Sequence, residues 1–275
     1  MTTFLSTLGG KLAQRLVGVL LLSGMLFVAA AVCAALLGQA HALDIARIAP
    51  TMTRLAKQHS TGAEVVLVAA GVLVAAGGAG VAASAAGQLT RTVWVGRWRG
   101  PAAPLGRWIV AARVRWARKA ADAAGVRPVP AYLPRRPTLV GERFRLLDAR
   151  VAAQYHGLRL ALVWPRLWVV LGESGRAPIE IANGKWQAAA VLTGWGWLYV
   201  VLGCWWFPAG VAGVVTAAIG WWQGRTHATT LVTLIEATLD TNLEALTTAL
   251  GIPRPEHGLT PEIAARINDL LQKGA

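Results

Sequence analysis

Residues 188–222 read AAAVLTGWGWLYVVLGCWWFPAGVAGVVTAAIGWW and contain no charged side chain over 35 positions. A single α-helix of this length would extend about 52 Å, well beyond the roughly 30 Å hydrocarbon core of a bilayer. We therefore predict two membrane-spanning helices, about 187–206 and 209–224, which turn near Phe207 and Pro208. Trp186 and Trp205 would lie about 28 Å apart along the first helix, close to one hydrocarbon thickness, and Trp favours membrane interfaces.

Two earlier apolar stretches predict another hairpin, with spans at about 16–38 and 65–87. Lys11 and Arg15 precede the first stretch, which favours a transmembrane helix with a cytoplasmic N-terminus. The alternative is a cleaved signal peptide, because Ala40-His41-Ala42 has the A-x-A form of a cleavage site. The first apolar stretch is, however, longer than the roughly 7–15 apolar residues typical of a signal peptide.

The second of these stretches, VVLVAAGVLVAAGGAGVAASAAG, consists mainly of Ala, Gly and Val. Small residues allow helix backbones to approach closely in a bilayer, where dispersion and weak polar contacts hold helices together. The stretch therefore predicts a helix that packs against a neighbour or forms a homo-oligomer contact. The alternative is that the small residues only reflect the composition of the genome.

Composition and charge support a membrane location. The 275 residues are 55% hydrophobic and only 15% charged, whereas charged residues make up about 25% of ordinary soluble domains. Residues 88–185 carry 18 basic and five acidic side chains, while residues 223–275 carry four basic and six acidic ones. Because positive segments are retained in the cytoplasm, we expect residues 88–185 and both chain termini on that side.

These patterns predict an all-α protein with four transmembrane helices in two hairpins and further helices in the cytoplasm. The expected domains are an N-terminal membrane hairpin, a basic cytoplasmic segment, a second hairpin and C-terminal cytoplasmic helices, at 1–87, 88–185, 186–224 and 225–275. The expected location is the cell membrane.

The segment 88–121 carries eight basic residues and no acidic one, with tryptophans interleaved. A helix starting near Leu105 would place an apolar stripe through Trp108 and Trp116, flanked by arginines, as in helices that lie on anionic membrane surfaces. The alternatives are an ordinary positive cytoplasmic loop without a ligand, and a nucleic-acid contact through Arg and stacked Trp. The candidate lipid or polyanion contacts are Arg97, Arg99, Trp108, Arg113, Arg115, Trp116 and Arg118.

Residues 126–138 contain four prolines and predict an extended connector. Thr138 is then positioned to cap a helix of about 139–155. The apolar residues of this helix share one face, which is typical of a packing surface. They are Val140, Phe144, Leu147, Val151 and Tyr155.

The apolar stretch LALVWPRLWVVLGE, residues 160–173, contains Pro165 and Arg166 at its centre. Residues 158–171 would form a helix of only about 21 Å, too short for a span, and would bury two arginines. We expect a cytoplasmic apolar element that Pro165 breaks or kinks. Its candidate docking residues are Trp164, Pro165, Arg166 and Trp168.

The C-terminal segment predicts two further helices. Leucines recur at helical spacing over residues 226–250, and Thr260-Pro261-Glu262 has the order of a helix N-terminus. We expect the leucine stripe to serve with the Pro165 segment as a docking surface. The charge difference predicts that this acidic tail docks on the basic segment 88–185.

Several of these pieces resemble an uncharacterised family of actinobacterial integral membrane proteins. The resemblance covers roughly residues 134–275, about half of the chain. It rests on LPRRPTLVGERFRLLDARVAAQYHGLRLALVWPRLW (133–168), the Trp/Gly-rich hairpin, and GLTPEIAARINDLLQKG (258–274). It implies a membrane location and an actinobacterial origin, and it implies no activity.

Motifs of catalysis are missing from the sequence. No P-loop, GxSxG or HExxH motif occurs, and the five histidines are scattered. We therefore expect no enzyme activity, no cofactor and no metal. Cys33 and Cys204 are expected near the outer ends of their helices, either as free thiols or as a disulfide between the hairpins.

The favoured hypothesis is an integral membrane scaffold that recruits a protein partner through its basic cytoplasmic segment. One alternative is a small pore-forming or effector protein that oligomerises through the small-residue helix. Another is a membrane component of mycelial DNA transfer, which would bind DNA through residues 88–185. The expected partners are the membrane, anionic lipid headgroups, and a protein partner or a second copy of the chain.

Overall fold

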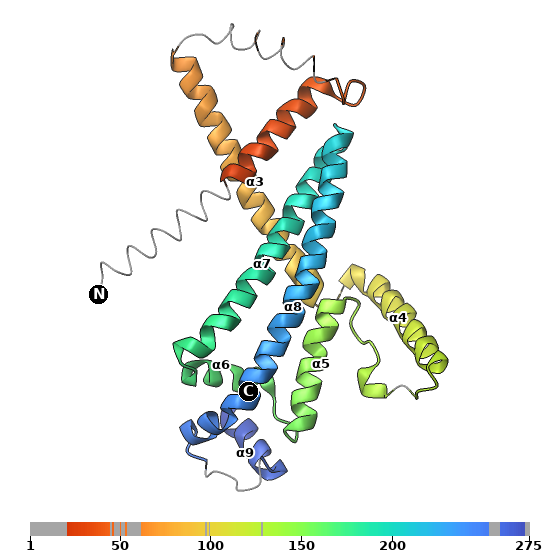
Figure 1. Ribbon diagram of the computed structural model, residues 1–275, viewed down its shortest axis with the longest axis vertical. Helices are drawn as coiled ribbons and strands as arrows, with labels where there is room; N and C mark the ends of the chain where they lie inside the picture. Colours follow the sequence, from red (N-terminus) through yellow and green to blue (C-terminus); the bar gives the residue numbers. More distant parts are fainter. Residues whose placement is uncertain are drawn as a thin grey trace, which may run out of the picture. The chain divides into compact units, whose positions relative to one another are not determined.

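The computed structural model describes residues 21–44, 46, 50, 53, 62–96, 98, 100–127, 129–252 and 259–272. These residues form helices and connecting turns, with no strand among them, so the all-α prediction is confirmed for this part of the chain (Figure 1). The first described helix is Leu21–Leu37. The others are α3 Gly62–Val95, η2 Gly100–Ala102, α4 Ala103–Ala123, η3 Pro130–Tyr132, α5 Leu139–Gln154, α6 Leu160–Val170, α7 Glu173–Leu202, α8 Phe207–Ala249 and α9 Pro261–Leu271.

One of these helices, α3, is long and apolar enough by length and composition to cross a membrane. It has 34 residues, about 51 Å of helix, and runs beyond the predicted span on both sides. Helix Leu21–Leu37 is also apolar but shorter within the described residues. The sequence prediction of four spans therefore stays a prediction.

Helices α7 and α8 are longer than expected. Helix α7 begins at Glu173 rather than near 187, and α8 joins the two helices expected at 209–224 and 226–250 into one of 43 residues. Residues 203–206 connect them, directly before the predicted turn at Phe207 and Pro208. Pro208 lies in the first turn of α8, where its missing N–H would have had no helical partner.

Helix α6 corrects the expectation for the Pro165 segment. Residues 160–170 form one helix that contains Pro165 in its interior, so the proline does not break it. Pro165 is exposed, while Val163 and Leu167 on either side are completely buried. Burying two branched side chains contributes a few kcal/mol, which is enough to offset the hydrogen bond that proline removes.

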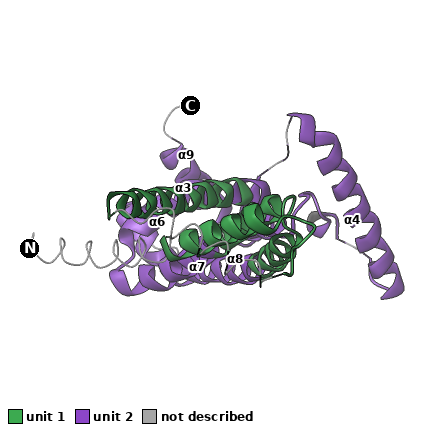
Figure 2. Ribbon diagram, turned by 90° about the horizontal axis from the view of Figure 1, so that it is seen from above, with its two compact units in different colours: residues 1–90, 189–222 green, residues 91–188, 223–275 purple. Residues whose placement is uncertain are grey.

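The chain divides into two compact units (Figure 2). Unit 1 contains residues 1–90 and 189–222, and unit 2 contains residues 91–188 and 223–275. Helices α3, α7 and α8 each contribute residues to both units.

Unit 1 is held together by close backbone contacts. A Cβ atom on Gly87 of α3 would lie 2.9 Å from Val191 Cα of α7, and a Cβ on Gly194 would meet the Ala83 carbonyl. Helices α7 and α8 approach equally closely, since a Cβ on Gly196 would lie 2.5 Å from Ala217 N. These helices can pack in this way only because glycine has no side chain.

Large apolar side chains of unit 1 point away from these contacts. Val74 in α3 is 76% exposed, and exposed valines, leucines and isoleucines recur along all of its helices. On α3 they include Val65, Val66, Leu67, Val68, Val81 and Leu89, and on α7 and α8 they include Val201, Val211, Val214, Val215 and Ile219. Unit 1 therefore has small residues inside and an apolar surface.

Two turns of unit 1 are joined by side-chain hydrogen bonds. The amide of Gln39 donates to the carbonyls of Gly203 (3.1 Å) and Cys204 (3.0 Å), and its oxygen accepts from the Phe207 N–H. The indole N–H of Trp206 donates to the Ala42 carbonyl at 2.9 Å. The turn after helix Leu21–Leu37 and the turn between α7 and α8 are thus at the same end of unit 1. Both cysteines of the chain are free thiols.

Unit 2 has a conventional core of branched side chains. The stripe predicted on α5 is largely buried, with Leu147 2% and Val151 1% exposed. Trp186, which the sequence suggested as an interface marker, is also buried and lies 5.8 Å from the Phe144 ring. Further fully buried residues are Leu158, Val163, Leu167, Val232, Leu239, Leu246 and Ile267.

The leucine stripe of 226–250 belongs to this core. Leu239 and Leu246 are completely buried, so this part of the stripe is an internal packing face and not the docking surface expected from the sequence. The acidic tail also contacts the basic segment within unit 2. Arg150 pairs with Glu236 at 3.0 Å, and the Tyr155 hydroxyl donates to Asp240 at 2.6 Å.

Candidate functional site

Helix α4 carries most of the predicted lipid or polyanion contacts. Proline at its N-terminus starts the helix, and its apolar stripe faces outward, with Trp108 65% and Trp116 77% exposed. Arg115 and Arg118 are exposed on the same helix. Arg97 and Arg99 lie outside the described residues. The arrangement combines uncovered aromatic surface with positive charge, as interfacial helices do.

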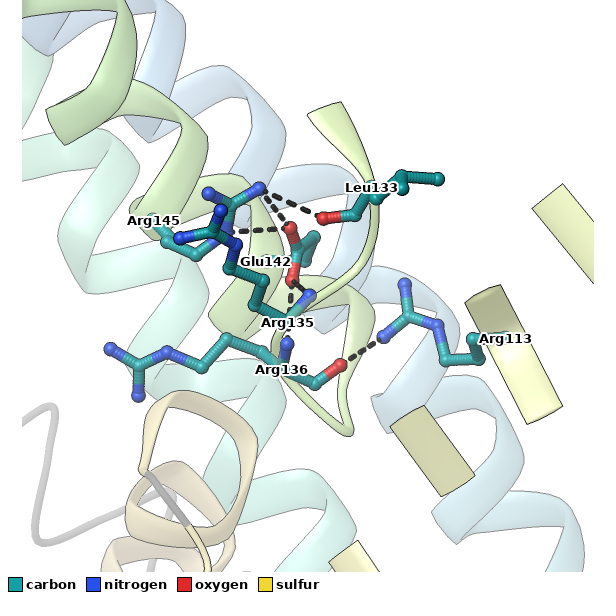
Figure 3. Close-up of polar contacts among 6 residues, drawn as sticks. All are labelled: Arg113, Leu133, Arg135, Arg136, Glu142 and Arg145. Carbon is teal, nitrogen blue, oxygen red and sulfur yellow. Dashed lines mark hydrogen bonds and ion pairs between the residues drawn. The ribbon is translucent and has the colours of Figure 1, made fainter. Parts of the chain in front are cut away.

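Arg113 instead faces the rest of unit 2. Its guanidinium donates to the Arg136 carbonyl at 2.7 Å (Figure 3). Burial lowers the pKa of the Arg113 guanidinium, and the nearby charge of Glu142 partly offsets this. Arg113 therefore links α4 to the segment before α5. Its guanidinium is bonded within unit 2, whereas Arg115 and Arg118 are exposed to a ligand from outside.

Glu142 of α5 organises the segment before its own helix (Figure 3). One carboxylate oxygen accepts from the backbone N–H groups of Arg135 (2.9 Å) and Arg136 (2.7 Å). The other pairs with the Arg145 guanidinium at 2.6 Å. A buried carboxylate is stable when its oxygens are hydrogen-bonded and its charge is paired. Glu142 therefore fixes the backbone of residues 135 and 136, while Arg145 neutralises its charge.

The same segment closes the C-terminal end of α3. Thr138 caps α5 by accepting from the Gly141 N–H at 3.0 Å, and its hydroxyl donates to the Trp94 carbonyl. The Arg136 guanidinium donates to the Val95 carbonyl at 3.3 Å. A cation beside the last carbonyls of a helix is favoured by the helix dipole. The exit of α3 is thus tied to the start of α5.

Between α4 and this segment lies a hollow of about 610 Å³. Residues that line it include Arg107 of α4, Arg135 and Arg136, together with Trp98 and Val110. Among the described residues that line it there is no Asp or Glu. The hollow is therefore lined by arginine residues and by apolar ones.

A second hollow, of about 530 Å³, lies beside α6. It contains three of the four predicted docking residues, Trp164, Pro165 and Trp168, and we call it the α6 groove. Its other residues come from α7 and α8 and are Ile179, Glu180, Asn183, Leu231 and Ile235.

The α6 groove has an ordered aromatic wall. The Trp164 and Trp168 rings lie 5.9 Å apart, and the Arg176 guanidinium lies 5.8 Å from the Trp168 ring. Arg166, the fourth predicted docking residue, instead donates to the Leu162 carbonyl at 3.0 Å. This bond turns its side chain back along its own helix.

Sequence reasoning missed the group around Glu142. The sequence pattern predicts only a connector at Pro134-Arg135-Arg136-Pro137 and only a helical position for Glu142. The available signal was a lone acid placed one turn after the Thr138 cap, in a segment rich in arginine. Arg107 and Trp98 are also absent from the predicted contact residues. Their neighbours in space are residues 135–137, and no pattern in the sequence shows this proximity.

Unit 1 contains one further hollow, of about 510 Å³. Phe27, Val28 and Leu198 line it together with small residues of α3. In the part of the chain that the structure describes, no group of three or more His, Cys, Asp or Glu side chains is placed to bind a metal.

Comparison with known proteins adds no assignment, since no family model, no curated protein and no solved structure matches the chain.

Proposed function

We propose that the protein is a multi-pass membrane scaffold, in which unit 1 is the anchor and unit 2 presents binding surfaces on the cytoplasmic side, without catalysis. The observation that carries this proposal is the inverted packing of unit 1, with glycine contacts inside and exposed Val and Leu outside. In water such an extended apolar surface would be costly, whereas in a bilayer it contacts lipid.

Several features support four spans. Helix α3 qualifies by length and composition. Residues 189–202 of α7 and 207–222 of α8 are uncharged, although Trp and Gly lower their mean hydropathy. The boundaries of unit 1, at 90, 189 and 222, are close to the predicted membrane limits at 87, 186 and 224.

Charge and turns support the orientation. The turns at 38–43 and 203–206 share one end of unit 1 through Gln39, as two hairpins with both loops outside would require. Residues 91–188 of unit 2 include all 18 basic side chains of segment 88–185. Positive segments favour the cytoplasm, so unit 2 and both termini are placed there in this proposal.

The proposed scaffold role uses two surfaces of unit 2. In this proposal α4 lies in the inner membrane interface. Its exposed Trp108 and Trp116 contact lipid there, and its arginines lie near anionic headgroups. The α6 groove is lined by three helices and carries an aromatic wall. A groove of this kind suits an amphipathic helix of a protein partner, which would insert apolar side chains between Trp168 and Ile235.

Topology reporters test the anchor. Fusions after Gly172 and at the C-terminus are expected to report the cytoplasm. Insertions after Asp44 and after Cys204 are expected to report the outside. A cytoplasmic signal after Asp44, or opposite signals from Gly172 and the C-terminus, would contradict the four-span arrangement.

Site-specific photocrosslinking tests the docking surface. A photoreactive residue at Trp168 is expected to form an adduct with one partner protein in cells, and Trp164→Ala is expected to weaken it. Val169 is the matched control, because it lies on the same helix, is 75% exposed and does not line the groove. Equal adducts at both positions, or none at Trp168, would count against docking there.

A further inference from the structure

The α6 groove combines buried apolar side chains with aromatic ones that are partly uncovered. Ile179 and Leu231 are each only 5% exposed. Trp164 and Trp168 are half-buried, and Pro165 between them is exposed. Apolar side chains of a partner gain free energy when they leave water for such a surface. The groove therefore has the apolar lining that a docking site requires.

The walls of the groove favour a helix as its occupant. They are the helices α6, α7 and α8, and no strand edge is available among the residues that line the groove. An extended peptide would leave its own backbone N–H and C=O groups without partners there, because helices use theirs internally. A helical peptide satisfies its own backbone and needs only side-chain contacts.

One edge of the groove is polar. Glu180 is the single charged residue among the described residues that line it, and it follows the buried Ile179 directly in the chain. In the described part of the chain, its exposed carboxylate has no ion-pair or hydrogen-bond partner. The amide of Asn183, one turn further along α7, also lacks a partner there. These two side chains give the apolar groove a negatively charged edge.

Two arginines of the adjacent segments are already engaged elsewhere. Arg176 lies one turn before Glu180 on α7, but its guanidinium is placed over an indole ring of α6 and donates to the Val169 carbonyl at 2.9 Å. Arg166 donates to the Leu162 carbonyl of its own helix. Neither arginine forms an ion pair with Glu180. The charge of Glu180 is therefore left for a cation from outside the chain.

We infer that the α6 groove binds an amphipathic helix that carries a lysine or arginine at the edge of its apolar face, and that this cation pairs with Glu180. The inference rests on the proposed scaffold function and deepens it by naming the charge of the partner. Neighbours on a helix surface are three or four residues apart, so the basic residue is expected at that distance from an apolar anchor. The ion pair selects the partner more than it tightens binding, because exposed pairs contribute little.

Binding of helical peptides to the full-length protein in phosphatidylcholine nanodiscs tests the inference. A displayed library of amphipathic helices of about 16 residues is selected on the wild-type protein, after empty nanodiscs have removed peptides that bind lipid. The selected helices are expected to carry Lys or Arg beside their apolar face. One of them is then synthesised with Lys, Gln or Glu at that position. The Gln peptide is expected to bind about fivefold more weakly than the Lys peptide, and the Glu peptide at least about tenfold more weakly.

Charge reversal at Glu180 gives the sharpest readout. Glu180→Lys is expected to invert the preference, so that the Glu peptide binds more tightly than the Lys peptide. Glu180→Gln should weaken the Lys peptide about fivefold. Glu173→Gln is the matched control, because it removes the same charge from an exposed residue of α7 that does not line the groove. At physiological salt it should change the affinity less than about twofold, since charges about 10 Å apart are largely screened. An unchanged preference in Glu180→Lys, or equal losses in the two Gln variants, would overturn the inference.

Trp164→Ala separates this inference from the proposed function. It removes part of the aromatic wall and is expected to weaken the Lys, Gln and Glu peptides alike. If it does so while Glu180→Lys leaves the preference unchanged, docking in the groove stands and the assigned charge of the partner is wrong. A library that yields no helix dependent on Trp164 would overturn the inference. An adduct between the photoreactive residue at Trp168 and a second copy of the chain would overturn it too, because the occupant would then be the protein itself.

Discussion

Units 1 and 2 pack the same helices in opposite ways. In unit 1, α7 contacts its neighbours through Gly194 and Gly196, and branched side chains such as Val201 face outward. In unit 2, the earlier part of α7 buries Ile179 and Trp186. Helix α8 makes the same change, from close contacts at Gly213 to the buried leucines of its second half.

This difference is what two solvents would produce, with unit 2 in water and unit 1 in the proposed bilayer. When the surroundings are water, apolar side chains are driven inside and fill a core. When the surroundings are lipid, that driving force is lost between helices, and close contact between small residues takes its place. One helix can therefore obey both rules if its two parts face different solvents, which is the basis of the proposed membrane anchor.

The largest expected effect compares a leucine of unit 2 with a valine of unit 1. Leu239→Ala removes a side chain that is fully buried, and we expect a loss of about 3 kcal/mol in the unfolding free energy of unit 2. Val74→Ala shortens a side chain that is 76% exposed and should cost less than about 0.5 kcal/mol. Hydrogen exchange of α3 and α8 in detergent micelles measures both. A larger loss from Val74→Ala would refute the inverted packing of unit 1.

A second comparison places one methyl group at two glycines of unit 1. In Gly194→Ala the new Cβ would meet the Ala83 carbonyl and lie 2.8 Å from Gly87 N, so α3 and α7 must separate. We expect a loss of about 2 kcal/mol, typical of overpacking. In Gly78→Ala the new Cβ has open space, and the helix should be unchanged or slightly more stable.

Unfolding by sodium dodecyl sulfate, followed by tryptophan fluorescence, distinguishes the two glycine variants. Trp195, next to Gly194, lies in the same helix and reports the separation. If Gly78→Ala proved to be the more damaging change, α3 would pack through its other face, for instance in a homo-oligomer. That outcome would revise the account of unit 1 without affecting unit 2.

Much of the fold was predictable because it depends on local rules. Thr138 and Thr260 were recognised as caps from their position before apolar runs, and both accept the expected backbone N–H. The turn before Phe207 followed from length, since 35 uncharged residues exceed one bilayer thickness. The helix expected at about 209–224 continues through Gly224 and Arg225 to Ala249, because nothing at that point breaks a helix.

The candidate site was predictable only in part. Aromatic and basic residues of α4 and α6 were named because each pattern lies within one helix. The charged hollow was missed, because it forms where Arg107 meets a segment almost 30 residues later. That meeting depends on Glu142 holding two backbone N–H groups, a contact that no periodicity reveals.

The smallest expected effect concerns the contact of the acidic tail with the basic segment in unit 2. Tyr155→Phe removes the 2.6 Å hydrogen bond to Asp240, and we expect a loss of about 1 kcal/mol because the pair is partly exposed. Burial raises the pKa of the Tyr155 hydroxyl above its usual value near 10, and the hydrogen bond and charge of Asp240 raise it further.

The raised pKa of Tyr155 sets the sign of a pH test. Above about pH 10 the unfolded tyrosine ionises while the folded one stays protonated, so wild-type stability falls with rising pH. Phenylalanine cannot ionise in either state. The stability difference between wild type and Tyr155→Phe, measured by denaturant unfolding, should therefore be largest at pH 7–9 and shrink above pH 10. The other tyrosines cancel in this difference. A gap that did not shrink above pH 10 would show that the pKa of the Tyr155 hydroxyl is not raised in the folded protein.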